Sequence, residues 1–240
     1  MNEEKFTISL AGRNIAVETL YDRTRLMCRD YLTEEKPDFS VKITPEDIER
    51  EQEEAKDTYG SAGSKGYLET LAVYRKIAEG MLDYDTFLMH GAAVCHNGKA
   101  YLFIAKSGTG KTTHVRLWLK NREDAFVVNG DKPLIRAGEE VLVCGTPWSG
   151  KENLNRNIQV PLKSIIIMER SGENRMERLS FSQALPMLLQ QTYRPMDASM
   201  MKKTINLLAG LNGRVSFFKF GFDNFKKDAF DVSFRALAEE

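Results

Sequence analysis

The sequence lacks the features that mark secreted, membrane-spanning and nucleic-acid-coating proteins. Of its 240 residues only three are cysteine, and these are scattered without a C-x-x-C pair, which argues against a disulfide framework. Lys+Arg and Asp+Glu number 34 each, so no excess of positive charge favours nucleic acid. The longest aliphatic run, residues 165–168, is far too short to cross a bilayer, and the acidic N-terminus lacks the apolar region of a signal peptide. We therefore expect a cytoplasmic protein with neither a nucleic-acid nor a membrane partner.

What the sequence does contain is a glycine-rich loop between an apolar segment and a helix. Residues 100–105 are apolar, and residues 114–120 after the loop are compatible with a helix. The loop consists of Ser107, Gly108, Thr109, Gly110, Lys111, Thr112 and Thr113. Glycines let successive backbone N–H groups turn toward an anion, and the helix N-terminus adds further donors. This context predicts a Walker A phosphate-binding loop (P-loop) that binds a nucleoside triphosphate. No base-reading motif in the sequence decides between ATP and GTP.

Each polar residue of such a loop has an expected role. Lys111 would reach the β- and γ-phosphates, and the Thr112 hydroxyl would be a ligand of Mg²⁺. Ala105 stands where the pattern G-x-x-x-x-G-K-[ST] has its first glycine. That exchange is acceptable if the backbone φ of Ala105 is not positive. The alternative is a Gly/Thr-rich surface turn that precedes a helix.

Two candidate catalytic residues lie outside the loop. Asp131 follows the apolar stretch 125–128 and lies about twenty residues after Lys111, where a metal-binding carboxylate is expected. It could bind Mg²⁺ or accept the proton of an incoming hydroxyl, or it could be a turn residue of the Asn-Gly-Asp sequence. His90 ends an apolar stretch before the loop and could contact the γ-phosphate or the acceptor, although a lone histidine is often structural.

A third polar segment is the candidate binding site of a second, anionic or phosphorylated group. In residues 144–152, which read C-G-T-P-W-S-G-K-E, the candidates are Thr146, Trp148, Ser149 and Lys151. The alternative is a Gly/Pro loop in which Trp148 packs on the core. Arg156 and Arg194 are weaker candidates for phosphate contact, because surface arginines are mostly only solvated.

The chain is long enough for one domain with an appendage. The stretch 60–66, G-S-A-G-S-K-G, is typical of a linker, although it could equally be a mobile loop beside the active site. We therefore expect a small α+β appendage or subdomain, 1–66, and a nucleotide-binding P-loop domain, 67–240. Within the former, residues 5–19 predict two short strands around a turn, and residues 20–32 predict a helix. Within the latter, residues 87–95 and 100–105 predict two strands joined by a hairpin at Asn97-Gly98. Further strands are expected over 125–128, 134–137, 140–144, 163–169 and 215–222, and helices over 181–191 and 198–211.

The order of His90, the hairpin, the P-loop and Asp131 resembles the catalytic domain of HPr kinase/phosphorylase. The run S-G-T-G-K-T-T is also similar to the P-loop of ATP-dependent phosphoenolpyruvate carboxykinases. The resemblance implies a mixed α/β fold with the P-loop in a partly antiparallel sheet flanked by helices. It also implies an ATP-dependent, Mg²⁺-assisted kinase that transfers phosphate to a serine-type hydroxyl of a peptide, protein or small molecule. Lys111, Thr112, Asp131 and His90 would carry that chemistry, and related kinases assemble into homo-oligomers.

The sequence departs from the pattern of these families at two positions. Lys106 stands where HPr kinases have an aspartate, and Gly130 precedes Asp131 where both families usually have a second aspartate. The missing carboxylate makes phosphorylase activity less expected and leaves a second possibility, an ATP-binding regulatory or scaffold protein without phosphotransfer. Decarboxylation of the phosphoenolpyruvate carboxykinase type is less expected still, because the chain is short and shows no second metal cluster. A globular protein without nucleotide binding is the third possibility.

Overall fold

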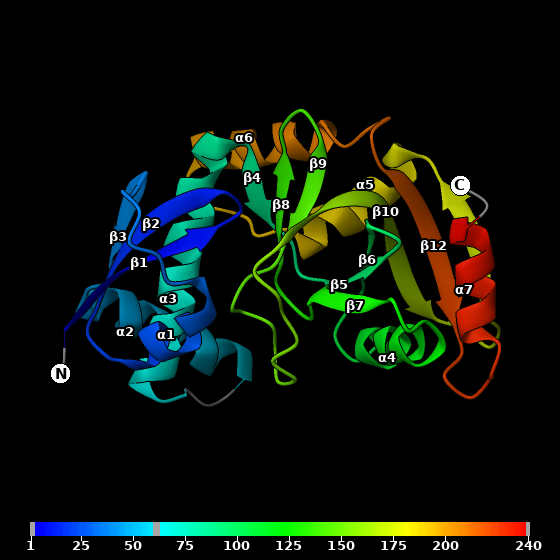
Figure 1. The fold of residues 1–240 in the computed structure, drawn as a ribbon, viewed down its shortest axis with the longest axis horizontal. Helices are drawn as coiled ribbons and strands as arrows, with labels where there is room; N and C mark the ends of the chain where they lie inside the picture. The colour runs from blue at the N-terminus through cyan, green and yellow to red at the C-terminus, as the bar shows by residue number, and fades with distance from the viewer. Residues whose placement is uncertain (1–2, 60–62, 239–240) are drawn as a thin grey trace. The chain divides into compact units, whose positions relative to one another are not determined.

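The computed structural model describes residues 3–59 and 63–238. They belong to two compact units that meet in the sequence between Asp83 and Tyr84. Within the described ranges, no helix combines the length and the apolar character that a bilayer crossing needs. Figure 1 gives the order of the elements along the chain.

The first unit contains a three-stranded sheet of order β1-β2-β3. Its strands are β1 (Glu4–Leu10), β2 (Arg13–Thr19) and β3 (Phe39–Lys42). The expected β1–β2 hairpin is present, and β3 pairs with β2 in parallel. The helices are α1 (Arg23–Met27), η1 (Arg29–Tyr31), α2 (Pro45–Tyr59), α3 (Lys65–Gly80) and η2 (Met81–Tyr84). Alternate residues of β1 and β2 are buried, as a sheet with one face on a core requires.

Helix α3 explains why the first compact unit continues to Asp83 instead of ending near residue 66. It packs against α1, α2, β2 and β3, all of which precede it in the chain. Ser64 caps its first turn by accepting a hydrogen bond from the Tyr67 N–H, so the helix begins inside the stretch expected as a linker. Residues 60–62 of that stretch lie outside the described residues.

The second unit is built on a mixed sheet, which has nine strands among the described residues. Seven follow the order β4-β8-β9-β10-β6-β5-β7, and β12 pairs with β10 and with β11. The strands are β4 (Thr86–Leu88), β5 (Ala92–His96), β6 (Lys99–Ile104), β7 (Phe126–Asn129), β8 (Leu134–Ala137), β9 (Val141–Cys144), β10 (Gln159–Arg170), β11 (Arg175–Leu179) and β12 (Ser216–Phe222). The long strand β10 pairs in parallel with β6 and β12 and antiparallel with β9. The expected mixed, partly antiparallel sheet is thus confirmed.

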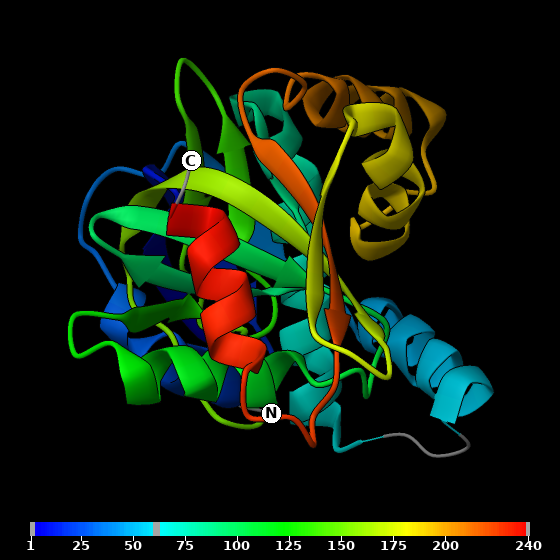
Figure 2. The same cartoon turned by 90° about the vertical axis from the view of Figure 1, so that its right-hand side faces the viewer.

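Helices cover both faces of this sheet. They are α4 (Lys111–Asn121), α5 (Phe181–Gln191), α6 (Ala198–Ala209) and α7 (Ala229–Ala238). Strand β12 shows the two faces: Phe218, Phe220 and Phe222 pack in the core with α4 and α7, whereas the Phe217 ring packs at a tilt against Phe181 of α5. Figure 2 shows α7 and α5 on opposite sides of β12. The aromatic residues of this strand are core residues, as expected.

Three features differ from the sequence-based prediction. The strand expected over 87–95 is interrupted at His90 and Gly91, because β4 pairs with β8 whereas β5 pairs with β6 and β7. Strand β11 and helix α7 were not predicted at all. The helix expected over residues 20–32 is shortened to α1 and η1. All three cysteines are free and buried, as expected for a chain without a disulfide framework.

Candidate functional site

The glycine-rich loop connects β6 to α4, in the strand–loop–helix order that the sequence predicts. Gly110 has a φ of 115°, and a Cβ there would lie 2.5 Å from Cε1 of Phe222. Only glycine combines that backbone conformation with so close an approach. Ala105 is fully buried and is not among the described residues with a positive φ, so the alanine is compatible with the loop.

Lys111 folds back over the loop that it terminates. Its Nζ donates a hydrogen bond to the carbonyl oxygen of Ala105 at 3.0 Å. Burial lowers the pKa of the Lys111 ammonium group, and the nearby charge of Asp131 opposes that shift. A half-buried ammonium group beside a glycine-rich loop is suited to bind phosphate oxygens.

The loop forms one wall of a cavity of about 580 Å³. The cavity brings together three segments that are separate in the sequence: the loop and first turn of α4, the residues around His90 and Asp131, and a turn over 149–152. Its lining residues are His90, Ala92, Ser107, Gly108, Thr109, Gly110, Lys111, Thr112, Thr113, Val115, Arg116, Gly130, Asp131, Ser149, Gly150, Lys151, Glu152 and Leu154. A volume of this size is typical of a small-molecule site.

His90 and Asp131 form a hydrogen-bonded pair in the lining of the same cavity. The His90 Nε2 lies 3.1 Å from Oδ1 of Asp131, and the Gly91 N–H donates to the Asp131 carbonyl at 2.8 Å. The break between β4 and β5 therefore places His90 beside Asp131. Burial would raise the pKa of the Asp131 carboxyl, but the His90 hydrogen bond and the charges of His90, Lys132 and Lys111 outweigh it and lower that pKa. Asp131 is thus ionised at neutral pH and accepts from His90.

Asn129 fixes the position of Asp131, and sequence reasoning missed it. The Asn129 Oδ1 accepts hydrogen bonds from the N–H groups of Asp131 and Lys132 at 2.9 and 2.7 Å. Its Nδ2 donates to the Thr146 carbonyl at 2.9 Å. Asp131 is therefore a turn residue and a cavity residue at once. The signal that could have identified Asn129 is the preference of asparagine for turns that its own side chain closes.

The turn over 149–152 approaches Asp131 closely. Gly150 has a φ of 78°, and a Cβ there would lie 3.1 Å from the Asp131 Cβ. Ser149 and Lys151 line the cavity. Glu152 joins this turn to α4 through an ion pair of 2.5 Å with Arg116. Glu152 and Arg116 were not predicted, because no sequence motif links two residues that only the fold brings together.

The remaining candidates of the sequence lie elsewhere. Thr146 is fully buried, and its Oγ1 donates to the Lys132 carbonyl at 2.8 Å. Trp148 is 5% exposed, which matches its alternative interpretation as a residue packed on the core. Neither of them, nor Arg156 or Arg194, is among the residues that line the loop cavity. The Arg156 guanidinium lies over the Phe126 ring, 4.2 Å from its centroid.

The residues fit a magnesium ion that would bind together with a nucleotide. Among the described residues, no group of three or more His, Cys, Asp or Glu side chains could hold a metal ion by itself. Thr112 and the ionised Asp131 both line the cavity and offer hard oxygen ligands. Mg²⁺ typically takes one or two such protein ligands and completes its shell with phosphates and water.

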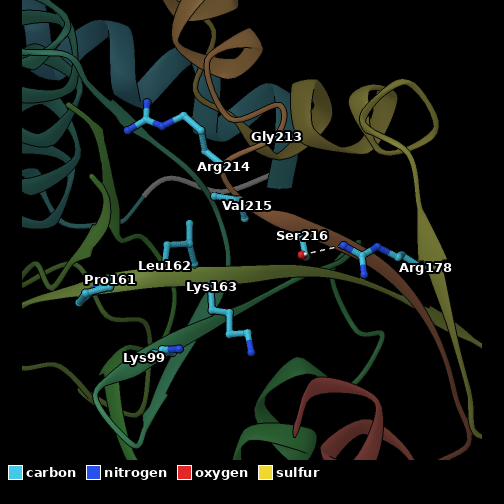
Figure 3. A pocket seen from close by; sticks show the side chains of 9 residues that line it. All are labelled: Lys99, Pro161, Leu162, Lys163, Arg178, Gly213, Arg214, Val215 and Ser216. Carbon is cyan, nitrogen blue, oxygen red and sulfur yellow. Dashed lines mark hydrogen bonds between the residues drawn. The ribbon is translucent and has the colours of Figure 1, made fainter. Parts of the chain in front are cut away.

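A separate cavity, of about 390 Å³, lies where strands β6 and β12 begin (Figure 3). It is lined by Lys99, the first residue of β6, and Ser216, the first residue of β12. Its charged lining residues are Lys99, Lys163, Arg178 and Arg214. None of its lining residues is a carboxylate, a histidine or part of the glycine-rich loop. The loop cavity, which has all three, is therefore the candidate active site.

Comparison with known proteins gives a likeness at the level of the fold. No protein-family model matches the chain, and no curated protein matches its sequence. Among solved structures, the HPr(Ser) kinase/phosphatase from Coxiella burnetii is similar, with 8% identity and a TM-score of 0.40. The similarity covers 63% of this chain and 92% of that chain. The activity therefore has to be inferred from the site itself.

Proposed function

We propose that the protein is an ATP-dependent phosphotransferase that moves the γ-phosphoryl group to a hydroxyl acceptor of the serine type, with Mg²⁺ as cofactor. The observation that carries this proposal is the His90–Asp131 pair, joined at 3.1 Å on the wall of the cavity that the P-loop also lines. A loop alone would bind phosphate. A histidine–carboxylate pair beside it supplies the acid–base group that transfer to a hydroxyl needs.

Different residues of the cavity would bind the phosphates and the metal ion. The loop N–H groups, Lys111 and the N-terminus of α4 bind the phosphates and balance the charge that develops on them. Thr112 and Asp131 would hold Mg²⁺, which supplies further charge neutralisation when bound. The acceptor oxygen forms a bond to the γ-phosphorus, and the bond from that phosphorus to the β-phosphate oxygen breaks, which releases ADP.

The acceptor proton leaves through the His90–Asp131 pair. When the His90 ring is neutral and donates its Nε2–H to Asp131, its Nδ1 can accept a proton. The Asp131 carboxylate orients this ring and stabilises the imidazolium that forms, as a carboxylate does in other histidine-dependent sites. Ser149 and Lys151 line the same cavity and are candidates for contact with the acceptor.

A second candidate function is ATP binding without phosphotransfer. Gly130 is the observation that favours it: a Cβ at that position would lie 3.0 Å from the Ser149 carbonyl oxygen, so the backbone leaves little room for a second carboxylate. The two functions differ in one measurable property, because only the phosphotransferase moves the γ-phosphate.

The test uses γ-labelled Mg·ATP and an array of synthetic serine peptides, free serine and glycerol, each peptide paired with its Ser→Ala version. We expect label on at least one serine acceptor with the wild type and none with Lys111→Ala. Tight Mg·ATP binding without label on any acceptor would instead favour the regulatory function. Label that Lys111→Ala transfers as fast as the wild type would reject the site.

A further inference from the structure

We propose that a second cavity that borders the P-loop holds the nucleoside, with its base stacked on Phe225. This inference rests on the proposed function, because it assigns the other half of the same nucleotide. The cavity measures about 580 Å³, within the size range of small-molecule sites. Four of its lining residues, Gly108, Thr109, Gly110 and Thr113, also line the cavity that contains His90 and Asp131.

The residues that the two cavities share indicate which end of a bound nucleotide lies in which cavity. The γ-phosphate belongs beside Lys111, Asp131 and His90, because an acceptor hydroxyl must meet it there. A triphosphate that lies along the loop amides from that point reaches Gly108 and Thr113, where the second cavity begins. The nucleoside end of the nucleotide then lies in the second cavity, whose walls contain neither His90 nor Asp131.

Phe225 makes this cavity suited to a flat aromatic ligand. Its side chain is 95% exposed, whereas Phe222 on the same cavity wall is 3% exposed and forms part of the core. An aromatic ring presents a face on which any base can stack, so it binds nucleosides with little regard to sequence or base type. Asn224 beside it carries an amide that can both donate and accept hydrogen bonds at the edge of a base.

Hydrogen bonds hold the segment of Phe225 in place before any ligand binds. The Phe225 N–H donates to Oδ1 of Asp223, and the Asp223 N–H donates to Oδ1 of Asn174, both at 2.8 Å. The Lys226 Nζ donates to the Gly172 carbonyl, also at 2.8 Å. The segments after β10 and after β12 are thereby joined. A ring on a fixed backbone loses less conformational freedom on binding than one on a free loop.

Arg170 links this cavity to the phosphate loop. It is the last residue of β10, it lines the cavity, and its Nη2 donates to the Gly108 carbonyl at 2.7 Å. Its guanidinium therefore places positive charge at the junction between the loop and the nucleoside cavity, where the α-phosphate of a bound nucleotide would meet the ribose. Guanidinium groups are well matched to phosphate oxygens.

The experiment compares Mg·ATP with Mg·tripolyphosphate, which has the phosphates and no nucleoside. Dissociation constants of both ligands are measured by calorimetry for the wild type, Phe225→Ala and Phe225→Trp. Met196→Ala is the matched control, because Met196 is 92% exposed and lies outside the cavity lining. We expect Phe225→Ala to bind Mg·ATP on the order of tenfold more weakly and tripolyphosphate unchanged, the effect of a lost stacking contact. Phe225→Trp should bind Mg·ATP as tightly as the wild type. Mg·ATP, but not Mg·tripolyphosphate, should quench the fluorescence of the introduced tryptophan.

The outcomes separate this inference from the function on which it rests. Wild-type protein that binds tripolyphosphate as tightly as ATP, or Phe225→Ala that weakens both ligands equally or neither, would overturn the nucleoside site while leaving the phosphate site intact. A wild type that binds neither ligand would overturn both proposals. Both proposals are supported if Lys111→Ala binds neither ligand and Phe225→Ala weakens the binding of ATP but not of tripolyphosphate.

Discussion

The hydrogen bond between His90 and Asp131 makes a quantitative prediction for a double-mutant cycle. His90→Gln and Asp131→Asn each remove part of the acid–base pair, and each should slow phosphoryl transfer by about 10²- to 10⁴-fold, the usual contribution of such a group. Independent residues would multiply these losses to about 10⁴- to 10⁸-fold in the double variant. Because the side chains are joined at 3.1 Å, we expect the double variant to be about as slow as the slower single variant.

The assay is single-turnover transfer of labelled phosphate at saturating Mg·ATP and saturating acceptor, so that changes in binding do not enter the rate. The chain offers a matched control pair in His96 and Asp124, whose Nε2 and Oδ1 atoms lie 3.4 Å apart outside the loop cavity. His96→Gln and Asp124→Asn should leave the rate within about twofold of the wild type, since they touch neither nucleotide nor acceptor. Fully multiplicative losses at His90 and Asp131, or equal losses in the control pair, would refute the reasoning.

Three further predictions concern the loop, the core and pH. Gly110→Ala should lower the free energy of unfolding in urea by about 1–3 kcal/mol and weaken tripolyphosphate binding, because its φ is 115° and the new Cβ meets Phe222; equal stability would contradict this. Trp118→Ala should cost about 3–5 kcal/mol in the same assay and Trp118→Phe clearly less, since Trp118 is fully buried among aromatic rings. Because the pKa of Asp131 is lowered in the folded protein, the advantage of the wild type over Asp131→Asn in the free energy of unfolding should decline as the pH falls below the unfolded pKa of about 3.9. A stability advantage of the wild type that grows on acidification would contradict this prediction.

Local signals were enough to predict the elements that carry the loop. The Asn-Gly hairpin, the apolar strand and the glycine pattern lie within a few residues of one another, and β5, β6 and α4 are where they were expected. Asn97 and Gly98 have φ values of 50° and 70°, as the hairpin turn requires. The mixed sheet followed from the same local pattern together with the family resemblance.

Contacts between distant parts of the chain could not be predicted in the same way. The break at His90 arises because β4 and β5 pair with different strands, and no local pattern records that choice. The Arg116–Glu152 pair joins residues that are 36 positions apart. The sequence suggested that Thr146 and Trp148 could hold an anion, whereas the buried hydrogen bonds of Thr146 and the burial of Trp148 turn both toward the core. Periodicity within one segment carries no information on such partners.

The most direct test of the central claim is thermal unfolding with and without millimolar Mg·ATP, for the wild type, Lys111→Ala and Lys120→Ala. Lys120 lies on the same helix as Lys111 but outside the cavity lining. A ligand at about 100 times its dissociation constant stabilises a protein by roughly 2.7 kcal/mol, which corresponds to a shift of several degrees. We predict that shift in the wild type and in Lys120→Ala, and its loss in Lys111→Ala. No shift in any of the three proteins, or the same shift in all of them, would contradict a phosphate site at this loop.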